Sequence, residues 1–139
     1  MFTFLEPFSS KLLAILRIVT GLLFLEHGTQ KWLHFPAAPV DPTKPPAPAL
    51  SIASLPGIAG AMELVGGVLI ILGLFTRPVA FLLSGEMAVA YWMAHAKRGP
   101  FPVLNGGDAA ILFCFVFLYL AAAGAGEWSL DRIMGKSRV

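Results

Sequence analysis

The fold is decided by residues 12–35, which read LLAILRIVTGLLFLEHGTQKWLHF. An α-helix needs about 20 mainly apolar residues to cross a hydrocarbon core of about 30 Å, and this stretch is long enough. Three further apolar stretches follow at residues 58–75, 79–96 and 109–126. We therefore predict an all-α protein, an integral membrane four-helix bundle that forms a single domain over residues 1–139.

The composition also indicates a protein that is embedded in a lipid bilayer. Hydrophobic residues make up 57% of the chain and charged residues 13%, with a net charge of +2, whereas soluble domains carry about 25% charged residues. The mean hydropathy is +0.77. The few basic residues are scattered, so a nucleic-acid partner is excluded. The single cysteine, Cys114, excludes a disulfide, a CxxC redox pair and a thiolate metal cluster.

The connections between the apolar stretches predict the topology. Residues 36–56 hold seven prolines and should form an extended, partly polyproline II loop. The tight connection at 76–78 predicts that the second and third stretches form an antiparallel hairpin. Lys and Arg residues favour a multi-pass protein of the cell membrane with both termini in the cytoplasm. The termini and the 76–78 turn carry Lys11, Arg77, Arg132, Lys136 and Arg138, and the opposite side carries Lys44, Lys97 and Arg98.

The apolar stretches contain ionisable side chains that a simple anchor does not need. Each costs about 2.5 to 3.5 kcal/mol at the centre of a membrane helix, so they should face one another or a wet cavity. Most lie toward the non-cytoplasmic side, where we predict a ligand-binding or proton-exchange cluster made of Glu26, His27, Lys31, Glu63, Glu86, Trp92, His95 and Asp108. Arg17 lies nearer the cytoplasmic end, where it is expected to snorkel toward Glu127, Asp131 or a lipid phosphate.

The balance of acidic and basic groups in this cluster predicts that a carboxyl group is protonated. Its four carboxylates face one lysine and three histidines, counting His34 at the rim, and they cannot all stay ionised cheaply in a medium of low dielectric. At least one of Glu63 and Glu86 is therefore expected to hold a proton at neutral pH. A quinone headgroup needs a donor, an acceptor and a proton exit within an apolar wall, and His27 with the two glutamates supplies these groups. An interhelical polar clamp explains the same residues without a ligand.

Metal ligation is a weaker interpretation. His34 and His95 near the outer rim resemble a pair of haem ligands, and Glu26, His27, Glu63 and Glu86 are ligands of the kind that hard metals accept. No ExxH pair supports a metal, so we expect none. Asp108 is expected to be the N-cap of the last span, and Trp92 is expected at the membrane interface, where it can also flank a planar ligand.

Five segments resemble the DoxX family of small four-helix membrane proteins. They are RIVTGLLFLEHGTQKW (17–32), GIAGAMELVGGVLIILGLFTR (57–77), AYWMAH (90–95), NGGDAAILF (105–113) and GAGEWSLD (124–131). By this resemblance His27, Lys31, Glu63 and Asp108 occupy motif positions, although the family often has glutamate where this chain has Asp108. The resemblance implies an association with quinone-linked respiratory enzymes and with resistance to redox stress.

We therefore expect a subunit or accessory protein of a quinone-linked membrane oxidoreductase. The sequence has no flavin or iron–sulfur motif, so we expect no intrinsic cofactor: a quinone would be bound from the membrane, and electrons would come from a redox partner subunit. Whether the chain itself is an enzyme stays open. The alternative is a small-molecule carrier, binding or assembly protein without redox chemistry, which would work as a homo-oligomer because four spans are few for a carrier.

Overall fold

The computed structural model describes residues 3–37, 39 and 49–135, and all regular secondary structure in this part of the chain is helical, without strands. The prediction of an all-α protein is confirmed. Residues 38 and 40–48 of the expected polyproline II segment lie outside the described residues. The long helices are α1 (Ser9–Leu33), α2 (Leu55–Leu72), α3 (Thr76–Ala90) and α5 (Asp108–Ala123). The shorter elements are η1 (Thr3–Phe8), the π-helical turn η2 (Tyr91–His95), η3 (Ala96–Arg98), α4 (Pro102–Asn105) and α6 (Leu130–Ile133).

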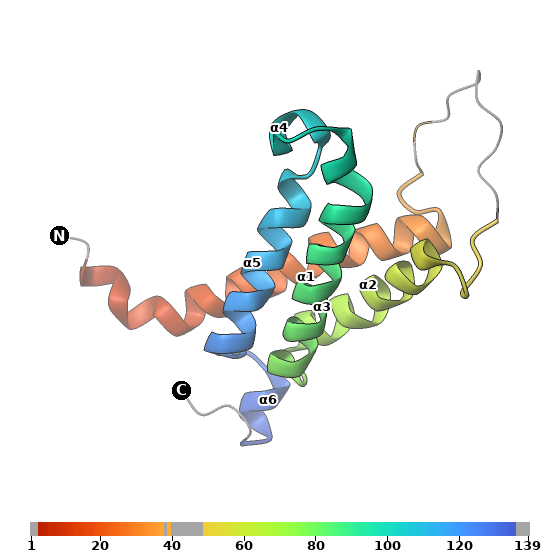
Figure 1. Ribbon diagram of the computed structural model, residues 1–139. Helices are drawn as coiled ribbons and strands as arrows, with labels where there is room; N and C mark the ends of the chain where they lie inside the picture. The colour runs from red at the N-terminus through yellow and green to blue at the C-terminus, as the bar shows by residue number, and fades with distance from the viewer. Residues whose placement is uncertain (1–2, 38, 40–48, 136–139) are drawn as a thin grey trace.

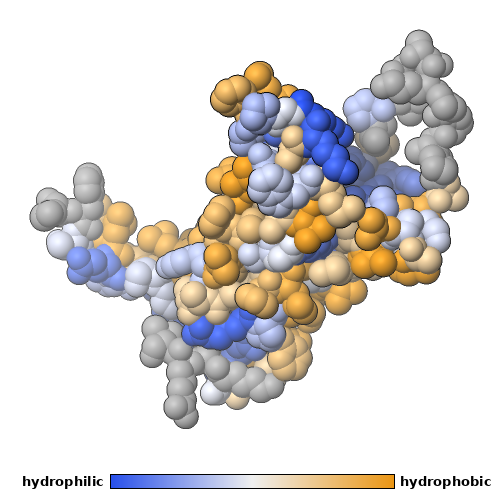
Figure 2. Space-filling view, viewed as in Figure 1, coloured by the Kyte–Doolittle hydropathy of each residue, from blue (hydrophilic) through white to orange (hydrophobic). Residues whose placement is uncertain are grey.

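Two helical stretches of the described chain are long and apolar enough to cross a membrane. They are Thr3–Leu33, which joins η1 to α1, and Leu55–Leu72. α5 is equally apolar but has only 16 residues. In the view of Figure 2, hydrophobic residues cover much of the visible surface, including the tip near α4, and hydrophilic residues lie in separate patches. Extensive exposed hydrophobic surface is expected of a protein that faces lipid.

The long helices form two antiparallel pairs that cross each other (Figure 1). α1 packs along α2 and α3 packs along α5, and these two pairings hold most of the contacts between elements. The prediction that the second and third apolar stretches form a hairpin is wrong, because α2 and α3 meet at the turn and then diverge. The face of α2 that carries Gly60 and Gly67 packs on α1. α3 therefore packs mainly on α5.

Glycines allow α1 and α2 to pack at close range. A Cβ atom at Gly28 would lie 2.7 Å from the backbone nitrogen of Leu64, and one at Gly67 would lie 2.9 Å from Cα of Leu25. No side chain fits at either position without a shift of backbone. Small residues of α2 are therefore used for contact between helices, as small residues in membrane helices commonly are.

The core lies where the two pairs cross. Phe24 of α1 is fully buried and meets the rings of Phe113 and Phe117 of α5 edge-on, at centroid distances of 5.4 and 4.8 Å. Such edge-to-face contacts stabilise a core beyond the area they bury, by about 0.5–1.5 kcal/mol each. Around them pack the other buried members of the core, namely Ile70, Ala80, Leu83, Met87 and Leu120. This aromatic contact joins the two helix pairs into one unit.

Arg17 does not snorkel, contrary to the expectation from sequence. Its side chain is completely buried and donates hydrogen bonds to five backbone carbonyl groups. Two belong to Ile70 and Ile71 at the end of α2, at 2.5 Å each. The other three carbonyls belong to Ala125, Glu127 and Trp128, in the segment between α5 and α6. Helix ends leave carbonyls without intrahelical partners, and the guanidinium supplies donors to them. The carbonyl of Ile70 also accepts from the backbone nitrogen of Gly73, at 3.1 Å.

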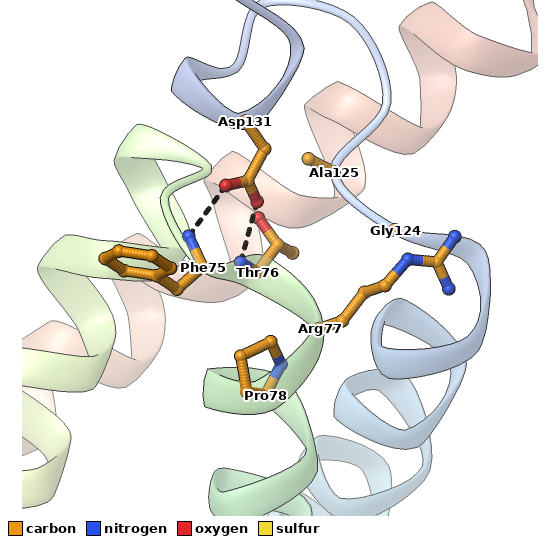
Figure 3. A pocket seen from close by; sticks show the side chains of 7 residues that line it. All are labelled: Phe75, Thr76, Arg77, Pro78, Gly124, Ala125 and Asp131. Carbon is orange, nitrogen blue, oxygen red and sulfur yellow. Dashed lines mark hydrogen bonds between the residues drawn. The ribbon is translucent and has the colours of Figure 1, made fainter. Parts of the chain in front are cut away.

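Two further side chains fix neighbouring helix ends (Figure 3). The carboxylate of Asp131 accepts hydrogen bonds from the backbone nitrogens of Phe75 and Thr76, at 2.9 and 2.8 Å, and so caps the start of α3. Arg77 donates to the last carbonyls of α5, those of Ala121, Ala122 and Ala123. The negative charge at a helix start and the positive charge at a helix end both match the helix dipole. The ends of α2, α3 and α5 are thus held at one end of the molecule.

Candidate functional site

The candidate site is an ion pair between α1 and α2 with a second carboxyl group beside it on α3. Nζ of Lys31 lies 2.6 Å from Oε1 of Glu63 and donates a hydrogen bond to it. The lysine side chain is 35% exposed, whereas the glutamate side chain is 5% exposed. The pair is therefore open to solvent or ligand from the lysine side only.

The local sequence explains why these two side chains meet. Gly28 precedes Lys31 by three residues in α1, and Gly60 precedes Glu63 by three residues in α2. A Cβ at Gly60 would lie 2.8 Å from Nε1 of Trp32 and 3.2 Å from Cδ of Lys31. The missing side chain lets the lysine stem lie flat on α2, so that its ammonium group reaches Glu63.

Glu86 of α3 completes the cluster. It interacts electrostatically with both Glu63 and Lys31, so α1, α2 and α3 each contribute one ionisable group. Both carboxyl oxygens of Glu86 and Oε2 of Glu63 are buried and have no hydrogen-bond partner in the described part of the chain. We name Lys31, Glu63 and Glu86 the carboxyl–lysine cluster.

The carboxyl–lysine cluster has more acceptors than its single ammonium group can satisfy. With all three groups ionised it would carry a net charge of −1 in a largely buried place, and three carboxyl oxygens would lack donors. A buried carboxylate without donors costs far more than a protonated one. A proton or a ligand that donates hydrogen bonds would satisfy these oxygens.

Glu26 and His27 do not join this cluster, and the expectation that they face the interior beside Glu63 is wrong. Both side chains are exposed on α1. His27 makes one ring contact, edge-on with Phe113 at 5.9 Å. The reason is angular: Gly28 and Lys31 occupy the face of α1 that packs on α2, and Glu26 lies on the opposite face at 100° per residue.

The remaining predicted residues lie just beyond the C-terminal end of α3, in η2, and at the start of α5. Trp92 is 68% exposed and packs edge-on against Tyr91 in the π-helical turn. His95 stacks on Tyr91 at 6.5 Å, and its Nδ1 lies 3.2 Å from the carbonyl oxygen of Asn105. No contact joins either residue to Glu86 among the described interactions. The structure thus brings together three of the eight predicted residues.

Asp108 is not the N-cap that the sequence predicted. It is the first residue of α5, the cap position is Gly107, and the Asp108 side chain is exposed without a capping hydrogen bond. Oδ1 of the buried Asn105 instead accepts from the backbone nitrogen of Gly107, at 2.8 Å. The acidic side chain still lies in the first turn, where it favours the helix dipole.

Metal ligands do not cluster in the described part of the chain, where no three His, Cys, Asp or Glu side chains are placed to hold an ion. The four-ligand set of Glu26, His27, Glu63 and Glu86 fails because the first two are exposed on α1. His34 ends α1 in a left-handed conformation and is exposed, whereas His95 is turned toward Asn105.

One family model and several curated proteins match this chain. The family model described as DoxX matches residues 12–96. A protein of Haemophilus influenzae is 43% identical over 91% of this chain and 93% of its own length. "Inner membrane protein YphA" of Escherichia coli is 34% identical, over 87% of this chain and 89% of its own. "Putative oxidoreductase CatD" of Bacillus subtilis is 26% identical, over 89% and 87%. No solved structure matches the chain.

Proposed function

Because the chain belongs to the DoxX family of membrane proteins, we propose that it serves a quinone-linked oxidoreductase of the cell membrane as a subunit or accessory protein. In this role the carboxyl–lysine cluster exchanges protons with a quinone headgroup. Reduction of a quinone to a quinol takes up two electrons and two protons. The cluster supplies a proton path, and a redox partner subunit supplies the electrons.

The observation that carries the proposal is the set of unpartnered carboxyl oxygens on Glu63 and Glu86. A purely structural clamp would pair its acceptors with donors, because an unpaired buried acceptor costs about 1–3 kcal/mol. A quinol hydroxyl group is a donor that would satisfy such an oxygen, and the quinone carbonyl is an acceptor for the lysine ammonium. The cluster thus offers both halves of what a quinone headgroup requires.

An apolar groove on the same two helices supports a hydrophobic ligand. It lies between α2 and α3, encloses about 380 Å³ and is lined by apolar side chains that include Met62, Val65, Leu82 and Leu83. Met62 adjoins Glu63 in the chain, and Leu83 lies one turn before Glu86. A quinone with its tail in this groove would keep the tail in an apolar environment beside the carboxyl groups. The name of the Bacillus relative, an oxidoreductase, points to the same class of chemistry.

The proposed topology has four membrane segments and both termini in the cytoplasm. α1 and α2 are the two segments of sufficient length, and α3 with its continuation to Arg98 and the shorter α5 are proposed as the other two. Basic residues number five on the side of the termini and three on the other side, as the positive-inside rule requires. The carboxyl–lysine cluster then lies in the non-cytoplasmic half.

Binding of quinone in nanodiscs tests the proposal. We expect the purified protein to retain quinone from the membrane and to bind added quinone in a fluorescence-quenching titration. Glu86→Gln should weaken binding about tenfold, because the amide cannot exchange the proton and a lost neutral hydrogen bond costs up to about 1.5 kcal/mol. Glu6→Gln is the matched control, because Glu6 is exposed on η1 and should leave affinity unchanged.

Other results of the titration would contradict the proposal. Protein free of quinone that shows no saturable binding would exclude a quinone site. Equal affinities of the Glu86→Gln variant and the unaltered protein would exclude the cluster as the site. Movement of a labelled small molecule into proteoliposomes without quinone binding would favour a carrier instead.

A further inference from the structure

The exposed face of α1 has a regular pattern that the proposed function does not use. Residues recur on it at alternating steps of four and three, which is the 3.5-residue repeat of helices that pack in parallel along a seam. Five positions of this seam are exposed leucine or valine, and the other two are polar: Leu12, Leu16, Val19, Leu23, Glu26, Gln30 and Leu33. We name this face the α1 seam.

The α1 seam faces away from the rest of the molecule. Its apolar members are 39–66% exposed, and the residues that α1 buries lie on the opposite side, among them Ala14, Gly21 and Gly28. Acyl chains would cover exposed leucines without cost. They would not suit Glu26 or the adjacent exposed His27, since a charged group facing lipid costs about 2.5–3.5 kcal/mol at mid-helix.

Glu26 and His27 have no polar side-chain partner in the described part of the chain. Neither side chain forms a hydrogen bond or an ion pair with any residue the structure describes, and the ring contact of His27 with Phe113 leaves its nitrogens unused. They lie six or seven residues before the end of α1, which is about 10 Å along the helix at about 1.5 Å per residue. A carboxylate and an imidazole therefore stand together, uncompensated, in a surface that is otherwise apolar.

We propose that the α1 seam is the contact surface of a homodimer in which Glu26 of each copy pairs with His27 of the other. Two copies inserted in the same orientation are related by an axis along the membrane normal, so their α1 helices run parallel and residues at the same depth meet. In a parallel seam a residue at the Glu26 position packs into a hole bordered by the residue that follows it on the second helix. That residue is His27, so the geometry places a carboxyl group beside an imidazole ring twice.

A second copy fits the seam better than a different partner does. The surface is self-complementary, since each α1 helix carries both the acid Glu26 and the base His27. The two-fold axis therefore gives each of these four side chains a partner at once. The leucine positions on either side would interdigitate and exclude lipid from the polar pair. This contact leaves the carboxyl–lysine cluster on the far side of α1, so the inference stands independently of the proposed quinone site.

Disulfide cross-linking in liposomes tests the proposal. In a Cys114→Ser background, Leu23→Cys places a thiol on the α1 seam, and Leu118→Cys places one on the exposed surface of α5, with 51% and 45% exposure of the replaced leucines. We expect mild oxidation to give at least fivefold more covalent dimer for Leu23→Cys. Equal yields for the two positions would overturn the proposal.

The polar pair is tested by energy transfer between labelled copies as protein is diluted in lipid. Either Glu26→Leu or His27→Leu should weaken association about tenfold, in line with interhelical hydrogen bonds of about 1–2 kcal/mol in membranes. The exchanged pair, Glu26→His with His27→Glu, should restore it. Association that is unchanged in the single variants, or not restored in the exchanged pair, would refute the pairing. Helical content by circular dichroism confirms that each variant is folded.

Discussion

Replacing Arg17 by leucine is expected to destabilise the protein by about 3–5 kcal/mol, enough to prevent stable folding of a small membrane domain. The loss is large because the fully buried guanidinium donates to five backbone carbonyls. Leucine would remove these donors at the end of α2 and in the segment after α5, where only the carbonyl of Ile70 keeps a second described donor, the backbone nitrogen of Gly73. Asp131, which interacts electrostatically with Arg17, would lose its nearby positive charge.

Unfolding by denaturant in mild detergent, followed by circular dichroism, measures this effect. Arg132→Leu is the matched control, because the Arg132 side chain is 55% exposed and its contact with Glu127 is 3.5 Å long; surface pairs contribute about 0–1 kcal/mol. Arg17→Lys should also fail, since an ammonium group cannot reproduce the planar fork of donors. A fully stable Arg17→Leu variant would show that the observed network does not hold the helix ends.

Replacing Lys31 by methionine is the second change of large expected effect. Methionine keeps the length of the side chain and removes the charge, so Glu63 would be buried without its only ion-pair partner among the described residues. Breaking a buried pair from one side costs about 3–5 kcal/mol. The exposure of Lys31 on one side reduces this cost, and we expect a loss near the lower end of that range.

A double-mutant cycle separates the pair from the packing around it. Lys31→Met with Glu63→Leu should recover much of the lost stability, since no uncompensated charge remains. Lys97→Met serves as control, because Lys97 is exposed and its loss should be nearly neutral. If the double variant were as unstable as the sum of the two single variants, the ion pair would not be the source of the effect.

The sequence predicts the helices well because hydrophobic runs and helix-breaking residues are local signals. Each apolar stretch is helical over most of its length, and the proline-rich segment and the Gly73–Phe75 turn separate them. Gly60 and Gly67 lie where α1 and α2 make close contact, and glycine in a membrane helix is a local signal for such contact. What local signals cannot supply is the choice of partners. The pairing of α3 with α5 depends on which face of α2 is already filled.

The candidate site can be predicted only in part, because residue types are visible in the sequence and the packing of helix faces is not. Ionisable residues in apolar stretches mark Lys31, Glu63 and Glu86 as unusual, but they mark Glu26 and His27 equally. Only the packing of Gly28 against α2 decides which face of α1 is buried. The spacing of exposed leucines along α1 was a signal for that choice, because residues at steps of three and four share a face. Glu26 lies on that face, and Lys31 does not.

The position of Arg17 is predicted wrongly from the sequence. A basic residue near a membrane boundary is expected at the surface, whereas Arg17 is buried. Its partners are backbone carbonyls far along the chain, at separations of 53 to 111 residues. Backbone acceptors carry no sequence signature, so nothing in the composition identifies them. The GAGEWSLD segment was a usable hint, since its Ser129 and Asp131 both cap helices and its position beside Arg17 follows from Gly126 packing on α1.

The central claim is that the carboxyl–lysine cluster holds an exchangeable proton on a glutamate within the membrane. Infrared difference spectroscopy of the protein in liposomes, recorded in normal and heavy water, tests it most directly. We expect the carbonyl stretching band of a protonated carboxylic acid at neutral pH, shifted in heavy water, absent in Glu86→Gln and retained in Glu6→Gln. A spectrum without such a band, or a band that persists unchanged in Glu86→Gln and Glu63→Gln, would contradict the claim.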